Sequence, residues 1–326
     1  MDLESLGYEI EVIHNYIDNY DKIIYDLHVP LFKLALKVPW VSYSPESVLV
    51  LLKKDSTIMG HVCCFYNDKK QQLEFGFFGL KNKNDKNTMN GLLEIIEKYA
   101  KKWNVSKIIG PVNTPAGIYL YGFDSTKQIE YLNFFRENGY QDRHIYRIYE
   151  IPILPKRNVK KIHGLRHIES MEGIDRDFLK SELHKAAKII IGDVSEDLII
   201  PNEVWDAVFY LIDNYAYPEC IQTAYNDNDE IQGSIIFLPN TNPEHLTNNG
   251  RTDELRIASA GWTRENTGKG YTLNHLYMFG NMCKKYHVKT LLGGQSDVSN
   301  YGVTRLMEKF GCKISYEHIV VEKNFT

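Results

Sequence analysis

The sequence predicts an α+β protein of two tandem domains, each a mixed and mostly antiparallel sheet flanked by helices. Three observations lead to this prediction. The chain has 326 residues, which is long for one compact domain and comfortable for two. Runs with the periods of strands and helices alternate along it. Residues 100–110 also line up without a gap on residues 283–293, as expected of an internal duplication.

A second pair of segments supports the duplication. Residues 134–139 (FFRENG) match residues 306–311 (LMEKFG), and the first copy carries extra chain before this segment. A basic stretch that follows two prolines separates the copies. We therefore expect domains at residues 1–152 and 162–326, joined by a linker at 153–161.

The elements of the first half follow from its apolar spacing and its turn residues. Apolar residues at three- and four-residue steps predict a helix over residues 11–36, interrupted at Pro30. Three strand-like runs joined by polar turns predict an antiparallel meander. They span residues 47–54, 57–66 and 72–80. A helix and a strand follow, at residues 88–103 and 106–112.

The second half is predicted to repeat this order. It opens with a strand near residues 163–168 and helices at 174–191 and 202–215. Strands follow at 219–225, 232–238 and 255–263. The polar segment 239–252, rich in Asn and Pro, is expected to be a mobile loop of a length that often borders a site. An apolar-periodic helix, the strand 288–292 and a second helix closed by Gly311 end the copy.

Composition and charge limit the class of protein. Hydrophobic residues make up 43% and charged residues 25%, as in ordinary soluble domains, and the net charge is −4 with dispersed lysines. We expect no nucleic-acid partner and no membrane partner, and we expect a cytoplasmic location, because no apolar window or signal-peptide pattern is seen. A homodimer is left open. The five cysteines, with Cys63 and Cys64 adjacent, favour buried thiols, and no cluster has metal-ligand spacing.

The turn Gly268-Lys-Gly270 lies where a strand leads into a helix. Glycine leaves the backbone N–H groups accessible, and a helix N-terminus attracts anions, so a phosphate-bearing ligand is a natural candidate. A plain tight turn accounts for the two glycines equally well.

Residues 254–313 resemble the acyl-CoA-binding core of the GNAT N-acetyltransferases. The resemblance is carried by the order of elements, the strand 288–292, the polar Asn300 before the next helix and the ending LMEKFG. In that family a turn with the pattern Gln/Arg-x-x-Gly-x-Gly/Ala wraps the pyrophosphate of coenzyme A. Thr267 or Glu265 takes the Gln/Arg place here, and Gly270 is kept in both registers. The resemblance implies acetyl-CoA, or another acyl-CoA, as co-substrate and no metal.

The same resemblance implies a set of cofactor-binding residues. These are Trp262, Thr263, Thr267, Gly268, Lys269, Gly270, Tyr271 and Thr272. In the family the fourth and fifth strands splay apart, so the strand at 255–263 would pair with the pantetheine amides. Asn300 would bond the same arm from the other side, or would cap the next helix.

Candidate substrate-binding residues come from the insert of the first half. Residues 110–124 (GPVNTPAGIYLYGFD) resemble the Gly-Pro-x-Asn…Gly-Phe-Asp loop of a group of bacterial GNAT-like proteins. Asn113, Tyr121 and Asp124 would line a substrate wall, although a loop folded over its own aromatic residues fits as well. The first copy's counterpart of the phosphate turn, residues 80–87, lacks a glycine pair. We therefore expect this half to have lost acyl-CoA binding.

Acyl transfer to an amine also needs groups that move protons. Glu254 and Asp297 are the carboxylates near the predicted strands, and Tyr301 is a nearby phenol, so these three are the candidate catalytic residues. Exposed acids at strand ends are, however, usually only solvated. In the resembled family a Tyr often serves as the general acid on the last helix, and Met307 occupies that place here.

The sequence thus predicts an acyl-CoA-dependent N-acyltransferase, most simply an N-acetyltransferase, acting on an amine of a small molecule. Its active site would lie in the C-terminal domain and face the N-terminal copy. Two alternatives remain. Fem-type transferases have tandem GNAT-like folds and take an aminoacyl group from tRNA, and a pair of degenerate copies would make a non-catalytic binding or scaffold protein.

Overall fold

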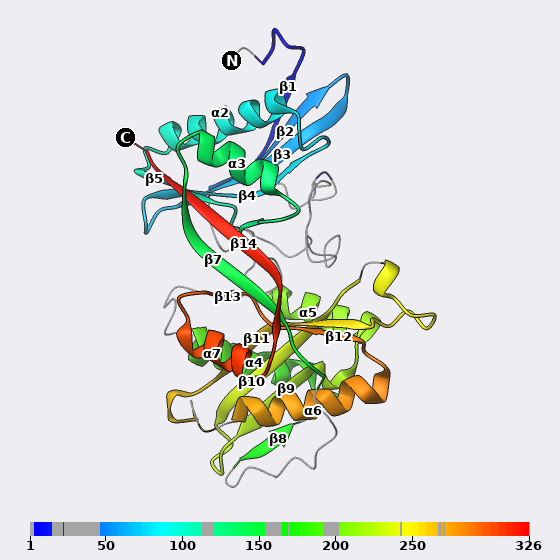
Figure 1. Ribbon diagram of the computed structural model, residues 1–326. Coiled ribbons are helices and arrows are strands. Elements are labelled where there is room, and N and C mark those ends of the chain that lie inside the picture. The colour runs from blue at the N-terminus through cyan, green and yellow to red at the C-terminus, as the bar shows by residue number, and fades with distance from the viewer. Residues whose placement is uncertain are drawn as a thin grey trace. The chain divides into compact units, whose positions relative to one another are not determined.

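The computed structural model describes residues 3–14, 22, 46–112, 120–153, 165–168, 170–191, 202–241, 243–266, 269 and 271–325. The chain divides into two compact units (Figure 1). Unit 1 comprises Met1–Arg147, Ser296–Asn300 and Tyr316–Thr326, and unit 2 comprises Ile148–Gln295 and Tyr301–Ser315.

This division differs from the expected domains at the chain's C-terminal end. The last residues, from Tyr316 onward, belong to unit 1 rather than to the second half. The reason is strand pairing, since the final strand completes the sheet of unit 1. Of the expected linker at 153–161, only Ile153 lies within the described residues.

Unit 1 is built around the predicted meander. Its first four strands pair in order and antiparallel. They are β1 (Glu9–Ile13), β2 (Ser47–Lys54), β3 (Thr57–Asn67) and β4 (Gln72–Leu80). Helix α2 (Lys86–Lys102) then leads to β5 (Lys107–Gly110), which is parallel to β4.

The remaining elements of unit 1 come from both ends of the sequence. They are β6 (Phe123–Asp124), α3 (Ile129–Glu137), β7 (Gln141–Glu150), β13 (Ser296–Asp297) and β14 (Lys313–Asn324). Strand β14 pairs antiparallel with β5 and β6, and β13 pairs with β7. Strands β7 and β14 contribute residues to both units.

The helix predicted over residues 11–36 is wrong at its start. Residues Glu9–Ile13 form β1, which pairs in register with β2 from Ile13↔Leu49 to Glu9↔Lys53. The helical apolar spacing begins only at Ile13, and the ladder with β2 places this residue and the four before it in a strand. Residues 15–21 and 23–36 lie outside the described part of the chain.

Unit 2 repeats the plan, and two helices lie between its first and second strands. Its elements are β8 (Arg166–Ile168), α4 (Arg176–Ile191), α5 (Asn202–Tyr215), β9 (Ile221–Tyr225), β10 (Ile231–Pro239), β11 (Glu254–Trp262), α6 (Tyr271–Tyr286), β12 (Thr290–Leu292) and α7 (Tyr301–Lys309). Strands β8 to β11 pair antiparallel in order, and β12 is parallel to β11. Leu292 of β12 also pairs with Glu150 at the end of β7.

The two units match in register as well as in order. The first three residues of β4 pair with β5, and the first three of β11 pair with β12. Strands β4 and β11 both have nine residues, as do helices α3 and α7. A left-handed glycine follows each of these helices, Gly139 (φ 84) and Gly311 (φ 67). The fold therefore contains one arrangement twice.

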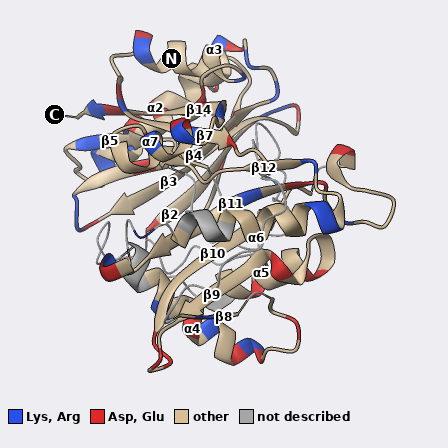
Figure 2. Ribbon diagram, turned by 60° about the horizontal axis from the view of Figure 1, so that its bottom comes forward, with Lys and Arg blue, Asp and Glu red and all other residues tan. Residues whose placement is uncertain are grey.

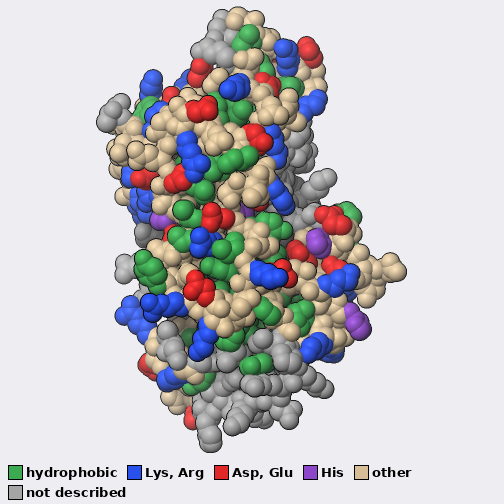
Figure 3. Space-filling view, viewed as in Figure 1, with side chains coloured by type: hydrophobic (Ala, Val, Ile, Leu, Met, Phe, Trp, Pro, Cys, Tyr) green, Lys and Arg blue, Asp and Glu red, His purple; other side chains and the backbone are tan. Residues whose placement is uncertain are grey.

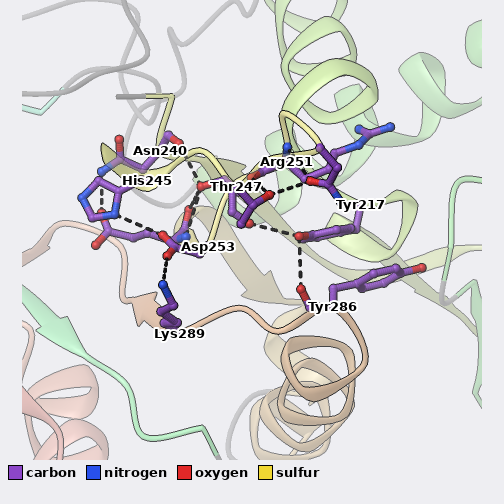
Figure 4. A network of polar contacts seen from close by, with 11 residues as sticks. Tyr217, Asn240, His245, Thr247, Arg251, Asp253, Tyr286 and Lys289 are labelled. Carbon is purple, nitrogen blue, oxygen red and sulfur yellow. Dashed lines mark hydrogen bonds and ion pairs between the residues drawn. The ribbon is translucent and has the colours of Figure 1, made fainter. Parts of the chain in front are cut away.

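The loop expected to be mobile, residues 239–252, is held in place over its described part. Arg251 donates to the carbonyl oxygens of Asp213 (2.6 Å) and Ala216 (2.7 Å) at the end of α5. Its guanidinium thereby supplies the partners that helix carbonyls lack at a C-terminus. The carbonyl oxygen of Arg251 in turn accepts from Thr247 Oγ1 (2.7 Å) (Figure 4). Asp253, which follows, pairs with Lys289 (2.7 Å) and His245 (3.3 Å).

The surface and the cysteines agree with a globular protein. Lysine and arginine occur on elements of both units beside acidic residues (Figure 2), and hydrophobic side chains on the face in Figure 3 lie among charged ones. No helix in the described part of the chain is long and apolar enough to cross a membrane.

All five cysteines are free and four are buried, which confirms the prediction of buried thiols. Burial raises the pKa of Cys283 to about 12.

Candidate functional site

The candidate site of unit 2 begins where β11 leaves its parallel neighbour. The ladder with β12 ends at Arg256↔Leu292, whereas β10 accompanies β11 as far as Trp262. Residues 258–261 therefore lie beyond the last pair of the ladder with β12. A strand edge of this kind can pair with an extended ligand through its backbone.

A β-bulge lies in the same stretch. Phe237 pairs with Ile257 and Ile236 pairs with Ser259, so Ala258 is an extra residue in β11. A bulge disrupts the ladder locally, bends the strand and re-aims its groups, and bulges are frequent beside active sites. Strand β4 has an irregularity at the corresponding place, between its pairs Cys63↔Gly76 and His61↔Gly79.

The two matching strands differ sharply in side-chain size and exposure. Every residue of β4 is buried, and the second half of that strand carries Phe75, Phe77 and Phe78. In β11 the exposed and half-buried residues 258–261 are Ala, Ser, Ala and Gly. Unit 1 thus encloses this part of the strand, and unit 2 leaves it accessible.

A small polar network organises the turn between β11 and α6. The buried Gln232 side chain accepts a hydrogen bond from Asn266 Nδ2 (2.8 Å) and one from Thr263 Oγ1 (3.3 Å). Asn266 Nδ2 also donates to Thr263 Oγ1 (2.9 Å), and Lys269 Nζ donates to Asn266 Oδ1 (3.3 Å). The exposed Lys269 is thereby held two residues before α6.

Two aromatic residues flank this turn. The Trp262 ring rests over Gly233, where a Cβ atom would collide with it, so this close approach requires glycine. The Trp262 and Tyr271 rings have centroids 5.1 Å apart. Three predicted cofactor residues, Thr267, Gly268 and Gly270, lie outside the described residues. The same is true of the side chain of Thr272.

Glu254 lies at the start of β11, four residues before the bulge. Its side chain is 9% exposed, and its Oε1 accepts a hydrogen bond from Asn240 Nδ2 (2.7 Å). It is therefore a buried, bonded carboxylate rather than the solvated acid typical of a strand end.

Asp297 belongs to unit 1 and forms a dyad with a histidine. His144 Nδ1 lies 2.8 Å from Asp297 Oδ2, and the Ser299 N–H donates to Oδ1 (2.8 Å). Burial alone would raise the pKa of Asp297, but the bonds from Ser299 and His144 outweigh it and lower that pKa. Burial and the Asp297 charge raise the pKa of Tyr146, which pairs with Asp297 across β7 and β13. Since Glu254 lies in unit 2, the structure does not bring the two predicted carboxylates into one unit.

The other residues predicted near the last helix are at the surface. Tyr301, the first residue of α7, is 74% exposed. Asn300 is exposed, and its N–H donates to the Asp297 carbonyl oxygen (2.9 Å) within a turn. Met307, in the place of the family's tyrosine, is buried.

The two described residues among the predicted substrate residues of unit 1 make contacts within that unit that support its structure. Asn113 lies outside the described residues. Tyr121 packs beside Ile109 and Val320, with its ring 6.3 Å from that of Tyr146. Asp124 is 1% exposed, and its Oδ1 accepts from the N–H groups of Thr126 (2.8 Å) and Lys127 (2.9 Å). This carboxylate stabilises the turn before α3.

Comparison with known proteins identifies the fold. No family model matches the sequence, and no curated protein matches it. A tandem GNAT protein from the clavulanic acid biosynthesis pathway matches in structure over 97% of this chain and 98% of its own, with a TM-score of 0.61 and 10% identity. The fold is that of the GNAT acetyltransferases.

Two further GNAT structures support this. An acetyltransferase of the GNAT family from Colwellia psychrerythraea matches over 97% of this chain and 100% of its own, with a TM-score of 0.55 and 12% identity. A GCN5-related N-acetyltransferase from Sphaerobacter thermophilus matches over 85% and 80%, with a TM-score of 0.52 and 15% identity. At these identities the likeness concerns the GNAT fold, and the site must be argued from this chain's own residues.

Sequence reasoning missed one polar network in unit 2 and one dyad in unit 1. Gln232 and Asn266 organise the turn before α6, and a polar residue at the start of an apolar strand was the available signal for Gln232. His144 had no such signal, because its partner Asp297 is 153 residues away in the chain. Among the described residues, no three His, Cys, Asp or Glu side chains come together as metal ligands would.

Proposed function

We propose that unit 2 binds an acyl-CoA and transfers its acyl group, in the first instance acetyl, to an amine of a small molecule. The observation that carries this proposal is the accessible stretch of β11 beyond the ladder with β12. The fold shared with GNAT acetyltransferases supports it.

The proposed binding mode uses backbone groups and one cation. The pantetheine arm carries two amides and would lie along residues 258–261 as an added strand. The pyrophosphate would lie at the N-terminus of α6, where backbone N–H groups and the helix dipole favour an anion. Lys269, held by Asn266, adds a positive charge at that place.

In the proposed reaction a neutral amine attacks the thioester carbonyl carbon. The new C–N bond forms, the C–S bond breaks, and the proton lost by the amine finally protonates the coenzyme A thiolate. Holding both reactants in place supplies much of the rate enhancement, and a positioned acid or base adds to it. Glu254 and Tyr301 are the unit 2 candidates for moving the proton.

Three contacts support the proposal that unit 1 no longer binds an acyl-CoA. Asp85 caps α2, accepting from the N–H groups of Asn87 and Thr88 (both 3.1 Å), so a carboxylate occupies the place a phosphate would take. The Tyr131 hydroxyl accepts the N–H of Leu80 (3.2 Å). Aromatic rings bury the second half of β4.

A thioester-consumption assay tests the proposal. The protein is mixed with acetyl-CoA and a panel of primary amines, free thiol is measured, and mass spectrometry identifies any acetylated amine. Ala260→Phe places in β11 the residue that β4 has at Phe78, and it should reduce acetyl-CoA affinity at least tenfold.

The matched control, Asp227→Phe, adds the same ring in the exposed turn between β9 and β10 and should leave affinity unchanged. Equal binding by the wild type and Ala260→Phe would contradict the proposed binding mode. If the protein binds acetyl-CoA but releases no coenzyme A thiol with any of the amines, a non-catalytic role would be favoured.

A further inference from the structure

The packing of α3 against β4 shows how the last helix meets the central strand in this fold. The rings of Phe75 and Phe135 stack at 5.0 Å with an interplanar angle of 8°. Phe78 meets Tyr131 edge to face at 5.3 Å. The side chains between β4 and α3 therefore form two layers. Phe78 and Tyr131 form one layer, and Phe75 and Phe135 form the other.

In unit 2, β11 can be aligned with β4 and α7 with α3, residue by residue. The pair Gly233↔Trp262 matches Gly60↔Leu80 at the end of the central strand. At the end of the last helix, Cys312 N donates to Met307 O (3.0 Å) as Tyr140 N donates to Phe135 O (3.1 Å). Ala260 and Val303 therefore replace Phe78 and Tyr131, and Ile257 and Met307 replace Phe75 and Phe135.

The residues that would form the two layers of unit 2, by the match with unit 1, differ in exposure. Ala260 is exposed and Val303 is half-buried, so the layer nearer the α6 turn is open. Ile257 is 7% exposed and Met307 is 8% exposed, so the next layer is closed. Three residues of β11 separate the two positions, and in unit 1 the matching rings of Phe75 and Phe78 have centroids 6.4 Å apart.

We propose that Met307, together with Ile257, forms the floor of the acyl pocket and restricts unit 2 to short acyl groups. The proposal rests on the proposed acyl-CoA binding. The open layer is continuous with the accessible edge of β11, so the occupant of the space is the acyl end of the thioester. The four side chains are uncharged, which suits an alkyl chain rather than an amine or a carboxylate. An unbranched, flexible methionine is well suited to filling such a gap.

Calorimetric titration with coenzyme A, acetyl-CoA, butyryl-CoA and hexanoyl-CoA tests this without knowledge of the acceptor. The wild type should bind hexanoyl-CoA at least tenfold more weakly than acetyl-CoA. Met307→Ala should reverse this order, because each methylene that enters the vacated space adds about fourfold in affinity. Met307→Phe, which restores the unit 1 residue, should reject butyryl-CoA as well.

Leu306→Ala is the matched control. It shortens a half-buried neighbour on the same helix and should leave the ratio of the hexanoyl-CoA and acetyl-CoA dissociation constants unchanged. Met307→Val provides a smaller truncation should the alanine variant fail to fold, and its ratio should shift in the same direction.

The outcomes separate the two proposals. An unchanged ratio in the Met307 variants, with acetyl-CoA still bound, would overturn the role of Met307 and leave the proposed function standing. Failure of the wild type to bind coenzyme A or any thioester would overturn both.

Discussion

The hydroxyl oxygen of Tyr131 lies 3.2 Å from the backbone nitrogen of Leu80 and accepts its hydrogen. In unit 1 a side chain of α3 thus accepts the hydrogen bond of the last backbone N–H group of β4. Val303 takes the same place in unit 2 and has no hydroxyl to do so. The replacement of Tyr131 by Val303 illustrates how the two copies differ. Helix α3 covers the end of β4 in unit 1, whereas the end of β11 in unit 2 is accessible.

Tyr131→Phe should lower the free energy of unfolding by about 1 kcal/mol, because it leaves the buried Leu80 N–H without this acceptor. Tyr140→Phe is the matched control, because its hydroxyl is buried and has no hydrogen-bond partner among the described residues. That change should be neutral or stabilising. Chemical denaturation measures both, and equal losses would argue against a specific role for the Tyr131 bond.

Asp85→Ala should cost about 1 kcal/mol of stability, since it removes the N-cap of α2. Asp85→Asn keeps a capping oxygen and should cost less. Neither change should alter acetyl-CoA affinity, because this helix N-terminus is not the proposed phosphate site. Weaker cofactor binding in a folded Asp85→Ala protein would show that unit 1 takes part.

Most regular elements could be predicted from the sequence. The strands expected at 47–54, 57–66 and 72–80 are β2, β3 and β4 with one boundary shifted by one residue, and the helix at 202–215 is α5. These elements have strong local signals, namely apolar periodicity bounded by polar turns.

Features that depend on distant pairing could not be predicted in this way. The apolar spacing that starts at Ile13 is helical, but pairing with β2, which lies more than thirty residues further on in the chain, makes Glu9–Ile13 a strand. The final strand β14 completes the sheet of unit 1, which no local pattern indicates. The dyad of His144 and Asp297 depends on the same kind of long-range contact.

Asp297→Asn should lower the pKa of Tyr146. Burial is the larger cause of the raised value, and the Asp297 charge adds to it, so the pKa should fall but stay above its ordinary value. The Cζ chemical shift of Tyr146, followed by NMR across the titration, measures the change. Asp142→Asn is the control, because that carboxylate is bonded to Arg136 instead. An unchanged Tyr146 titration in Asp297→Asn would contradict the arrangement of the dyad.

Asp253 should make unit 2 less stable as the pH falls into the acid range. Burial alone would raise the pKa of Asp253, but its bonds with Lys289 and His245 outweigh this and hold it below its ordinary value. The stabilisation is complete above the unfolded-state pKa of about 4 and is lost as the pH falls through the lower folded value.

Asp253→Asn should therefore unfold at lower denaturant concentration than the wild type at pH 7, and the difference should shrink toward pH 3. Asp227→Asn, in the exposed turn after β9, serves as the control and should show no such trend. A constant difference across this range would mean that the charge of Asp253 contributes nothing.

The most direct test of the account is the stoichiometry of acetyl-CoA binding, measured by calorimetry on the whole chain. Gly270→Asp adds a carboxylate to the turn before α6, and Lys86→Asp adds one at the start of the matching helix α2. We predict one site per chain, abolished in Gly270→Asp and retained in Lys86→Asp. Two sites, or a single site lost only in Lys86→Asp, would contradict the assignment of acyl-CoA binding to unit 2.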